Sequence, residues 1–333
     1  MKSAGVLIVI SLLLTISAGC KNKQVTQQGK NPVLLGFSQI GAESAWRTYN
    51  SKSIRKAAEE NGIQLLFSNA EQKQENQIKA IRSFIVYRVD VIAFVPIVQD
   101  GWDNVLREAK NAHIPVIVCD RKIRTKDESL YAAYIGTDSV EEGRKAARFL
   151  LQKYEGAGGT HSILELRGTD GSSASDGRAQ GFREELSKNK AFRIIYSESG
   201  NFIRSRGREI ARNILDANND ALQIGGEKID IIFSANDGMT LGFLEELASR
   251  GIATGNQESG ITVVTVDAQQ EAIDKLRSGD INCVIECEPD IGQEVMDAAK
   301  KLAAGERVPR LLHVEEEIFT ENDDLLRIAP RNY

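Results

Sequence analysis

Polar and aromatic residues follow the apolar runs of this sequence, at the points where those runs end. Carboxylates and amides form planar pairs of hydrogen bonds, arginine donates a fork of N–H groups, and an aromatic ring covers an apolar face. A single residue of this kind is as often only a helix cap. Together they match a ring of hydroxyls with an apolar face, as in a sugar. The set comprises Trp46, Arg47, Asp120, Arg121, Asn236 and Asp267.

The elements that must position this set alternate between apolar runs and amphipathic stretches. Strands are expected at residues 33–37, 63–67, 89–95, 114–119 and 131–135, and again at 162–166, 192–196, 229–233, 261–266 and 282–285. Apolar residues at a spacing of three to four predict helices around residues 54–58, 78–85, 241–247 and 295–302. This order predicts parallel sheets covered on both faces. The rhythm restarts after residues 156–159, so we expect two α/β lobes with a cleft, and ligands of such sheets bind beyond the carboxyl ends of the strands.

The N-terminus predicts export. Lys2 precedes an apolar run at residues 6–16, which is too short to cross a bilayer core, and Ser17-Ala18-Gly19 precedes Cys20. This arrangement resembles the bacterial lipobox, in which the cysteine is lipidated and becomes the new N-terminus. Plain secretion with an incidental cysteine is the alternative. The polar residues that follow, up to about residue 32, are typical of a flexible tether.

The remaining cysteines, Cys119, Cys283 and Cys287, are expected to be buried small residues. Cys283 and Cys287 share one extended stretch and would lie roughly 13 Å apart, at about 3.3 Å per residue. A disulfide needs Cα atoms within about 7 Å. No second Cys or His pair supports a zinc site, so no metal is expected.

Other function classes find little support. A formal net charge of −5 argues against a nucleic-acid partner. His113, His161 and His313 have no metal-ligand spacing, and the common hydrolase and phosphate-loop motifs are missing from the sequence. Asp120 beside Arg121 is expected to stay ionised, which suits hydrogen bonding more than proton transfer. We therefore expect no catalytic residues and no cofactor.

Several short motifs occur in an order that resembles one known family. They are residues 36–39 (GFSQ), 43–47 (ESAWR), 74–78 (QENQI), 114–116 (IPV) leading to Asp120-Arg121, 234–237 (SAND) and Val266-Asp267. The chain resembles the ribose/galactose type of periplasmic sugar-binding protein that feeds ABC importers. It is most similar to the galactofuranose-binding branch, and the resemblance covers nearly the whole chain after the tether.

The resemblance implies the type I periplasmic binding protein fold, with two Rossmann-like lobes joined by a hinge of three crossings. Residues 1–19 would be the signal peptide, and residues 20–32 the lipidated cysteine and tether. The N-terminal lobe would comprise 33–137 and about 288–316. The C-terminal lobe would comprise 138–287 and about 317–333.

The resemblance also implies a set of ligand contacts and partners. The ligand-binding residues would be Glu43, Trp46, Arg47, Asp120, Arg121, Arg178, Phe202, Asn236, Asp267 and Glu286. At the last position Glu286-Cys287-Glu288-Pro289 does not fix which residue faces the cleft, and Glu286 is chosen. An arginine at position 47 and the lack of an asparagine near Val95 argue against ribose.

We expect the chain to be a monomeric lipoprotein that carries a lipid on Cys20. It would be exported and lie at the outer face of the cytoplasmic membrane or in the periplasm. It would capture a monosaccharide, galactofuranose-like or related, and deliver it to an ABC permease and its ATPase. Two alternatives stay open: a sensor that presents sugar to a chemoreceptor or two-component kinase, and an exported sugar hydrolase or isomerase. A LacI-type repressor is excluded by the signal peptide and the missing helix-turn-helix.

Overall fold

The computed structural model describes Met1 and residues 32–333 of this chain. The predicted lipidation site, Cys20, lies outside the described residues, as do the signal peptide after Met1 and the tether up to residue 31. Residues 32–333 form one compact unit. In this unit no helix is both long and apolar enough to cross a membrane.

The first sheet has the strand order β13-β5-β4-β3-β1-β2, and all its pairings are parallel. Its strands are β1 (Leu34–Gln39), β2 (Gln64–Asn69), β3 (Val91–Phe94), β4 (Val116–Cys119), β5 (Ala133–Gly136) and β13 (Leu311–His313). A parallel order needs a crossover between neighbouring strands, and the helices supply it. The prediction of a parallel sheet is confirmed here.

The second sheet has the strand order β14-β12-β11-β10-β6-β7. Its strands are β6 (His161–Arg167), β7 (Phe192–Ser199), β10 (Ile231–Ser234), β11 (Thr262–Asp267), β12 (Cys283–Glu286) and β14 (Ile318–Thr320). Only β14, at one edge, is antiparallel to its neighbour. A small hairpin of β8 (Gln223–Ile224) and β9 (Glu227–Lys228) stands apart from both sheets.

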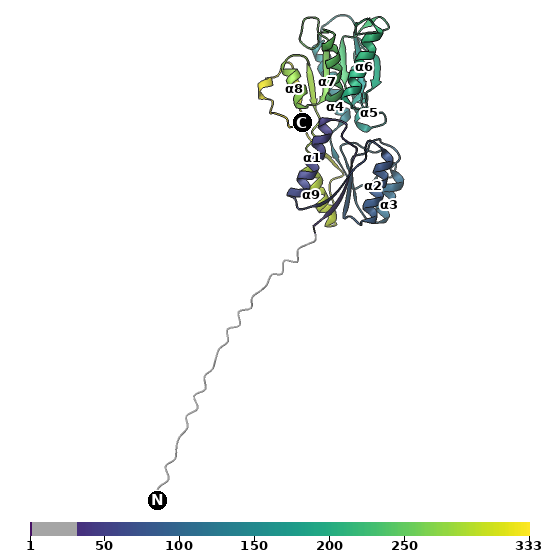
Figure 1. Ribbon diagram of the computed structural model, residues 1–333, viewed down its shortest axis with the longest axis vertical. Coiled ribbons are helices and arrows are strands. Elements are labelled where there is room, and N and C mark those ends of the chain that lie inside the picture. Colours follow the sequence, from purple (N-terminus) through teal and green to yellow (C-terminus); the bar gives the residue numbers. More distant parts are fainter. Residues whose placement is uncertain (2–31) are drawn as a thin grey trace. The chain divides into compact units, whose positions relative to one another are not determined.

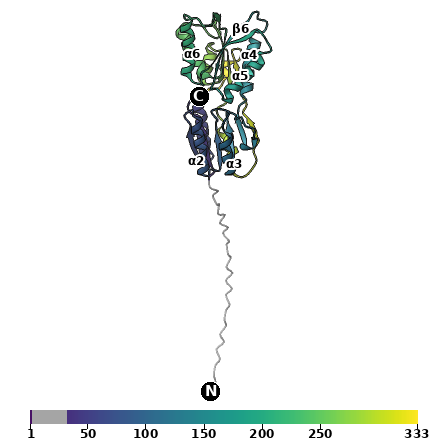
Figure 2. The same ribbon diagram turned by 90° about the vertical axis from the view of Figure 1, so that its right-hand side faces the viewer.

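Helices cover both faces of each sheet. They are α1 (Ala45–Glu60), α2 (Gln74–Val86), α3 (Asp103–Asn111), α4 (Ser139–Lys153), α5 (Ser173–Leu186), α6 (Arg204–Ala217), α7 (Asp237–Ser249), α8 (Gln270–Arg277) and α9 (Gly292–Ala303), with short 3₁₀ turns η1 (Glu128–Leu130) and η2 (Leu325–Arg327). Figure 1 shows α1 and α9 on one side of the first sheet, and α2 and α3 on the other. Figure 2 shows α4 and α5 across the second sheet from α6.

These layers enclose four apolar clusters, one on each face of each sheet. The first sheet buries the apolar sides of α1 and α9 on one face and of α2 and α3 on the other. The second sheet buries α6, α7 and α8 on one face and α4 and α5 on the other. Cys119, Cys283 and Cys287 are buried and free, as predicted.

The chain passes between the sheets at three points. It leaves the first sheet after β5, returns after β12 to α9, which packs against α1, and leaves again between β13 and β14. Residues of all three connections therefore lie at the junction of the two sheets. The carboxyl ends of the central strands of both sheets face this junction, where the sequence predicts the ligand contacts.

Candidate functional site

A small cavity lies between the carboxyl ends of the two sheets. Nine of the ten predicted contacts line it, together with Ser44, Ala174 and Cys287. The exception is Glu286, whose Oε2 accepts a hydrogen bond from the Glu317 amide (2.9 Å) and whose Oε1 pairs with Arg331 (2.5 Å). Neighbouring residues of a strand point to opposite faces, and Cys287 is the one that reaches the cavity. The cavity volume is about 20 Å³, which holds one or two water molecules. The two sheets must therefore move apart before a larger ligand can enter.

The N-terminus of α1 positions one wall of the cavity. Ser44 is the N-cap, and its Oγ accepts a hydrogen bond from the Arg47 amide (3.1 Å). This cap starts the helix directly after the loop that follows β1, so Trp46 and Arg47 lie in its first turn. Asn50, one turn further on, accepts from Arg47 Nη1 (3.4 Å) and donates to the carbonyl of Pro289 (2.9 Å).

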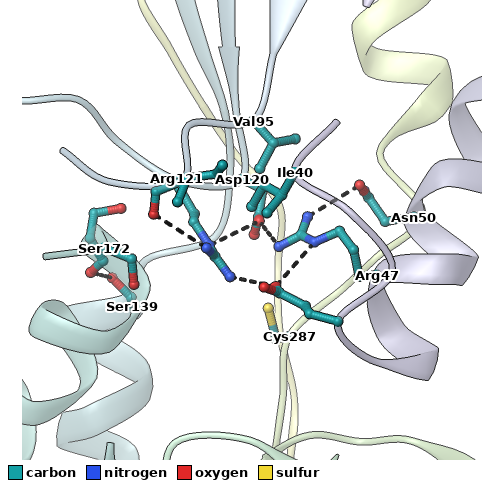
Figure 3. Close-up of polar contacts among 12 residues, drawn as sticks. Ile40, Arg47, Asn50, Val95, Asp120, Arg121, Ser139, Ser172 and Cys287 are labelled. Carbon is teal, nitrogen blue, oxygen red and sulfur yellow. Dashed lines mark hydrogen bonds and ion pairs between the residues drawn. The ribbon is translucent and has the colours of Figure 1, made fainter. Parts of the chain in front are cut away.

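A buried network of two arginines and two carboxylates forms the polar part of this wall. Arg47 Nη2 lies 2.5 Å from Asp120 Oδ2, and Arg121 Nη2 lies 2.6 Å from Glu43 Oε1. Figure 3 shows Asp120 in contact with both guanidinium groups. Burial opposes the charge of Arg47, but Asp120 and Glu43 outweigh it and raise its pKa. The network is charged, and its fork-shaped donors match paired oxygens.

The second lobe contributes Arg178, from the middle of α5. Its Nε pairs with Glu142 Oε2 (2.5 Å), and its Nη1 donates to the carbonyl of Ala235 (2.6 Å) and lies 3.8 Å from Asp267 Oδ1. Burial raises the pKa of Asp267 to about 7, against the opposing charge of Arg178. Near neutral pH this carboxyl can therefore either accept or donate a hydrogen bond.

Asn236 has two roles in the structure. It is the N-cap of α7, with Oδ1 accepting from the Met239 amide (3.0 Å), and its Nδ2 donates to the carbonyl of Phe202 (3.3 Å). The cap explains why an asparagine follows β10, and the side chain nevertheless lines the cavity.

Two aromatic rings complete the lining. Trp46 is almost fully buried, and its Nε1 donates to the carbonyl of Cys287 (2.5 Å). The guanidinium of Arg47 lies 4.5 Å from the Trp46 ring centroid, and that of Arg121 lies 4.9 Å from the centroid of Phe202. A sugar presents one or two apolar faces of the size that such rings cover.

One acidic cluster behind the cavity has the composition of a metal site. A carboxylate oxygen of Glu142, one of Glu316 and the sulfur of Cys287 lie within 4.8 Å of one another. The positive charge of Arg178 already pairs with Glu142, and burial raises the pKa of the Cys287 thiol well above its usual value. A metal ligand must be deprotonated, so this cluster does not suit a divalent cation. No motif in the sequence marks Glu142, which lies in α4.

Comparisons with known proteins identify the family of the chain. The family described as a periplasmic binding protein domain matches residues 35–307. The galactofuranose-binding protein YtfQ of Escherichia coli (strain K12) is 34% identical over 281 residues, which are 84% of this chain and 85% of that protein.

Two solved structures are similar throughout the described unit. A Mycobacterium smegmatis protein in complex with β-D-fucofuranose has a TM-score of 0.81 and 44% identity, covering 87% of this chain and 91% of that one. The binding protein of the arabinose ABC transporter from Shewanella sp. ANA-3, bound to α- and β-L-arabinofuranose, has a TM-score of 0.80 and 37% identity, covering 87% and 92%. The predicted family and fold are confirmed, and the chain belongs to the periplasmic binding proteins.

Proposed function

We propose that this chain captures a monosaccharide in its furanose form and delivers it to an ABC permease. The observation that supports this most is the cavity itself, where arginine forks, carboxylates and two aromatic rings from both lobes converge. These groups match hydroxyls and apolar sugar faces. We also propose that the chain acts as a monomer and leaves the sugar chemically unchanged.

The furanose assignment comes from the relatives. Their names or bound ligands include galactofuranose, β-D-fucofuranose and L-arabinofuranose. D-Galactose, D-fucose and L-arabinose share the configuration of carbons 2 to 4. In the furanose form they therefore have the same ring and differ only in the exocyclic chain. We propose a ligand with this ring.

Capture requires the two lobes to close on the sugar. We propose lobe boundaries at about residues 137–138, 287–288 and 316–317, the three points where the chain passes between the sheets. Direct contacts across the cleft support the closed arrangement: the Gln99 amide donates to the Gly171 carbonyl (2.8 Å), and Gln99 Nε2 donates to Asp176 (2.8 Å). A sugar that contacts both lobes shifts the equilibrium toward closure by its differential binding energy.

A binding experiment with labelled sugar tests this proposal. We expect D-galactose, L-arabinose or D-fucose to stabilise the purified full-length chain, with about 2.7 kcal/mol gained at 100 times the dissociation constant. With ¹³C-labelled sugar, the NMR shift of the bound anomeric carbon should be that of a furanose. Binding of the pyranose alone would contradict the ring assignment, no binding would contradict capture, and a new chemical species would show an enzyme.

We propose that the chain is lipid-anchored through Cys20. The sequence Ser17-Ala18-Gly19-Cys20 and the polar segment that follows support it. Cys20→Ser is expected to abolish acylation and to release the protein into the soluble fraction. Cell fractionation with metabolic labelling by a fatty-acid analogue measures both effects, and Cys119→Ser, which changes a buried cysteine, is the control. Membrane association equal to that of the parent would contradict the anchor.

A further inference from the structure

The loop before α6 holds the Phe202 ring in the cavity wall. Asn201 and Phe202 both have a left-handed backbone (φ 55° and 63°), which is uncommon for residues other than glycine. The carbonyl of Phe202 accepts a hydrogen bond from Asn236 Nδ2 (3.3 Å), and the side chain is only 3% exposed. The hydrogen bond holds the Phe202 backbone in place, and burial restricts the movement of its ring.

Gly168, directly after β6, lies against the face of this ring. A Cβ added to Gly168 would stand 2.0, 2.2 and 2.4 Å from three neighbouring atoms at the tip of the Phe202 ring. The near equality of these distances places the added carbon over the face of the ring rather than in its plane. The φ of Gly168 lies outside the left-handed region, so the backbone conformation does not require glycine. The ring does.

The backbone of Gly168 is held in place and cannot yield easily to a larger side chain. Its carbonyl accepts a hydrogen bond from Ser199 Oγ (2.6 Å), and the Arg167 carbonyl accepts one from the Gly200 amide (2.9 Å). Carbon atoms in contact are about 3.5–4.0 Å apart. With alanine at position 168, the Phe202 ring would have to withdraw by more than about 1 Å.

We expect that movement to take the ring toward the cavity. Phe202 lines the cavity and Gly168 does not, so the ring separates Gly168 from the cavity. We infer that Gly168 is a positioning residue that determines which sugars fit: it sets the depth of the Phe202 ring, and thereby leaves room for the exocyclic chain of a six-carbon furanose. This inference rests on the proposed function.

Two sugars with the same ring test the inference. D-Galactofuranose has one CHOH unit more than L-arabinofuranose, on the exocyclic chain. One methylene in a tight pocket changes affinity by about 10- to 200-fold. We therefore expect Gly168→Ala to raise the dissociation constant for galactose at least about tenfold more than that for arabinose. Only part of each free sugar is furanose, but this fraction lowers the apparent affinity equally for parent and variant.

The experiment compares four variants of the full-length chain by isothermal titration with both sugars. Gly158→Ala is the matched control, because its added Cβ meets nothing within 4 Å and its φ is also outside the left-handed region. Phe202→Leu and the double variant Gly168→Ala/Phe202→Leu complete a cycle. The smaller leucine should remove most of the effect of Gly168→Ala, which a merely structural role of Gly168 would not predict.

The outcomes distinguish a failure of the inference on Gly168 from a failure of the proposed function. Galactose/arabinose selectivity unchanged by Gly168→Ala, in a parent that binds sugar, would overturn the inference, and a parent that binds neither sugar would overturn the proposed function instead. If Gly168→Ala does not fold, folding of the double variant supports the clash with the ring. Failure of both Gly168 variants to fold, while Phe202→Leu folds, would show that Gly168 contacts something other than the ring and would overturn it too.

Discussion

Arg178→Ala is expected to weaken sugar binding by about 2–5 kcal/mol, the cost of truncating one partner of a buried charged contact. This corresponds to roughly a 30- to 4,000-fold rise in the dissociation constant. Arg178 is the cationic side chain that the second lobe contributes to the cavity lining, opposite Arg47 and Arg121 of the first. Without it the sugar gains less from contact with the second lobe. Ligand-induced closure should therefore weaken together with affinity.

Titration calorimetry and small-angle scattering, each with and without saturating sugar, measure the two effects. Arg206→Ala is the matched control: Arg206 lies on α6 of the same lobe, its side chain is 39% exposed, and its one ion pair within residues 32–333 is with Glu209 on its own helix. Thermal unfolding of the sugar-free variant separates a stability loss, because Arg178→Ala also leaves the buried Glu142 without its ion pair. Equal affinity and equal compaction in parent and variant would remove Arg178 from the site.

The strands could be predicted from the sequence because buried parallel strands are continuous apolar runs, but three of the predicted starts are early for one physical reason. Ile63, Val89 and Ile114 donate their amides to the last turn of the preceding helix, at Ala58, Phe84 and Ala109 (2.9, 3.2 and 3.0 Å). The residue before each has a positive φ. These apolar residues thus close a Schellman motif before the strand begins.

Helix α5, which presents Arg178, had no clear apolar period in the sequence. Gly177 and Gly181 pack closely against α4. A Cβ added to Gly177 would clash with Ser139 Oγ, and one added to Gly181 would clash with the carbonyl oxygen of Val140. Close packing of small residues replaces the apolar stripe that marks most helices. The family motif therefore predicts Arg178, whereas nothing in the sequence marks its partner Glu142 on α4. The choice between Glu286 and Cys287 depends on strand orientation, which a short run of residues does not fix.

The second large effect concerns the two carboxyl groups at the junction of the lobes. Glu142 lies on α4, and Glu316 lies in the connection between β13 and β14. Thr137 and Cys287 of the other two connections lie beside them and contact each other (3.7 Å). Oε1 of both glutamates is buried and has no hydrogen-bond donor among the described residues. One oxygen of each carboxyl group lies within 4.8 Å of the other, and two carboxylates at such a distance do not both stay ionised. A proton shared between the two groups would give each oxygen a hydrogen-bond partner.

The surroundings decide which glutamate carries the proton. Arg178 pairs with Glu142 Oε2, and although burial opposes ionisation, this charge keeps the pKa of Glu142 below its usual value. Burial, followed by the charge of Glu142, raises the pKa of Glu316 to about 11. The charges of Arg178 and Lys145 oppose this rise. Arg178 pairs with Glu142, however, and Lys145 Nζ donates to the Glu316 carbonyl rather than to its carboxyl group (2.8 Å). We therefore predict that at neutral pH Glu142 is ionised and Glu316 is protonated.

The same substitution at the two positions should therefore have opposite consequences. Glu142→Gln removes the nearest counter-charge of the buried Arg178 guanidinium and leaves only Asp267, at 3.8 Å, among the carboxylates paired with it in the described residues. It is expected to lower the free energy of unfolding by about 3–5 kcal/mol. Glu316→Gln replaces a carboxyl O–H by an amide N–H, which can donate to Glu142 in the same way. At neutral pH it is expected to raise the free energy of unfolding, because the glutamine takes up no proton when the chain folds. Urea unfolding followed by circular dichroism measures both, with Glu315→Gln, an exposed neighbour on the same segment, as the control.

The pH dependence makes the assignment of the proton testable. A group whose pKa is higher in the folded chain stabilises it fully below its unfolded pKa, and this contribution is lost as pH rises toward the folded value. For Glu316 the loss begins above about pH 4.5, the usual glutamate value. Relative to the parent, Glu316→Gln should therefore gain free energy of unfolding between pH 5 and pH 9, by at most about 1.4 kcal/mol per pH unit. A constant difference between Glu316→Gln and the parent over this range would show that the two carboxyl groups do not share a proton. An unchanged stability of Glu142→Gln would show that Arg178 does not depend on the charge of Glu142.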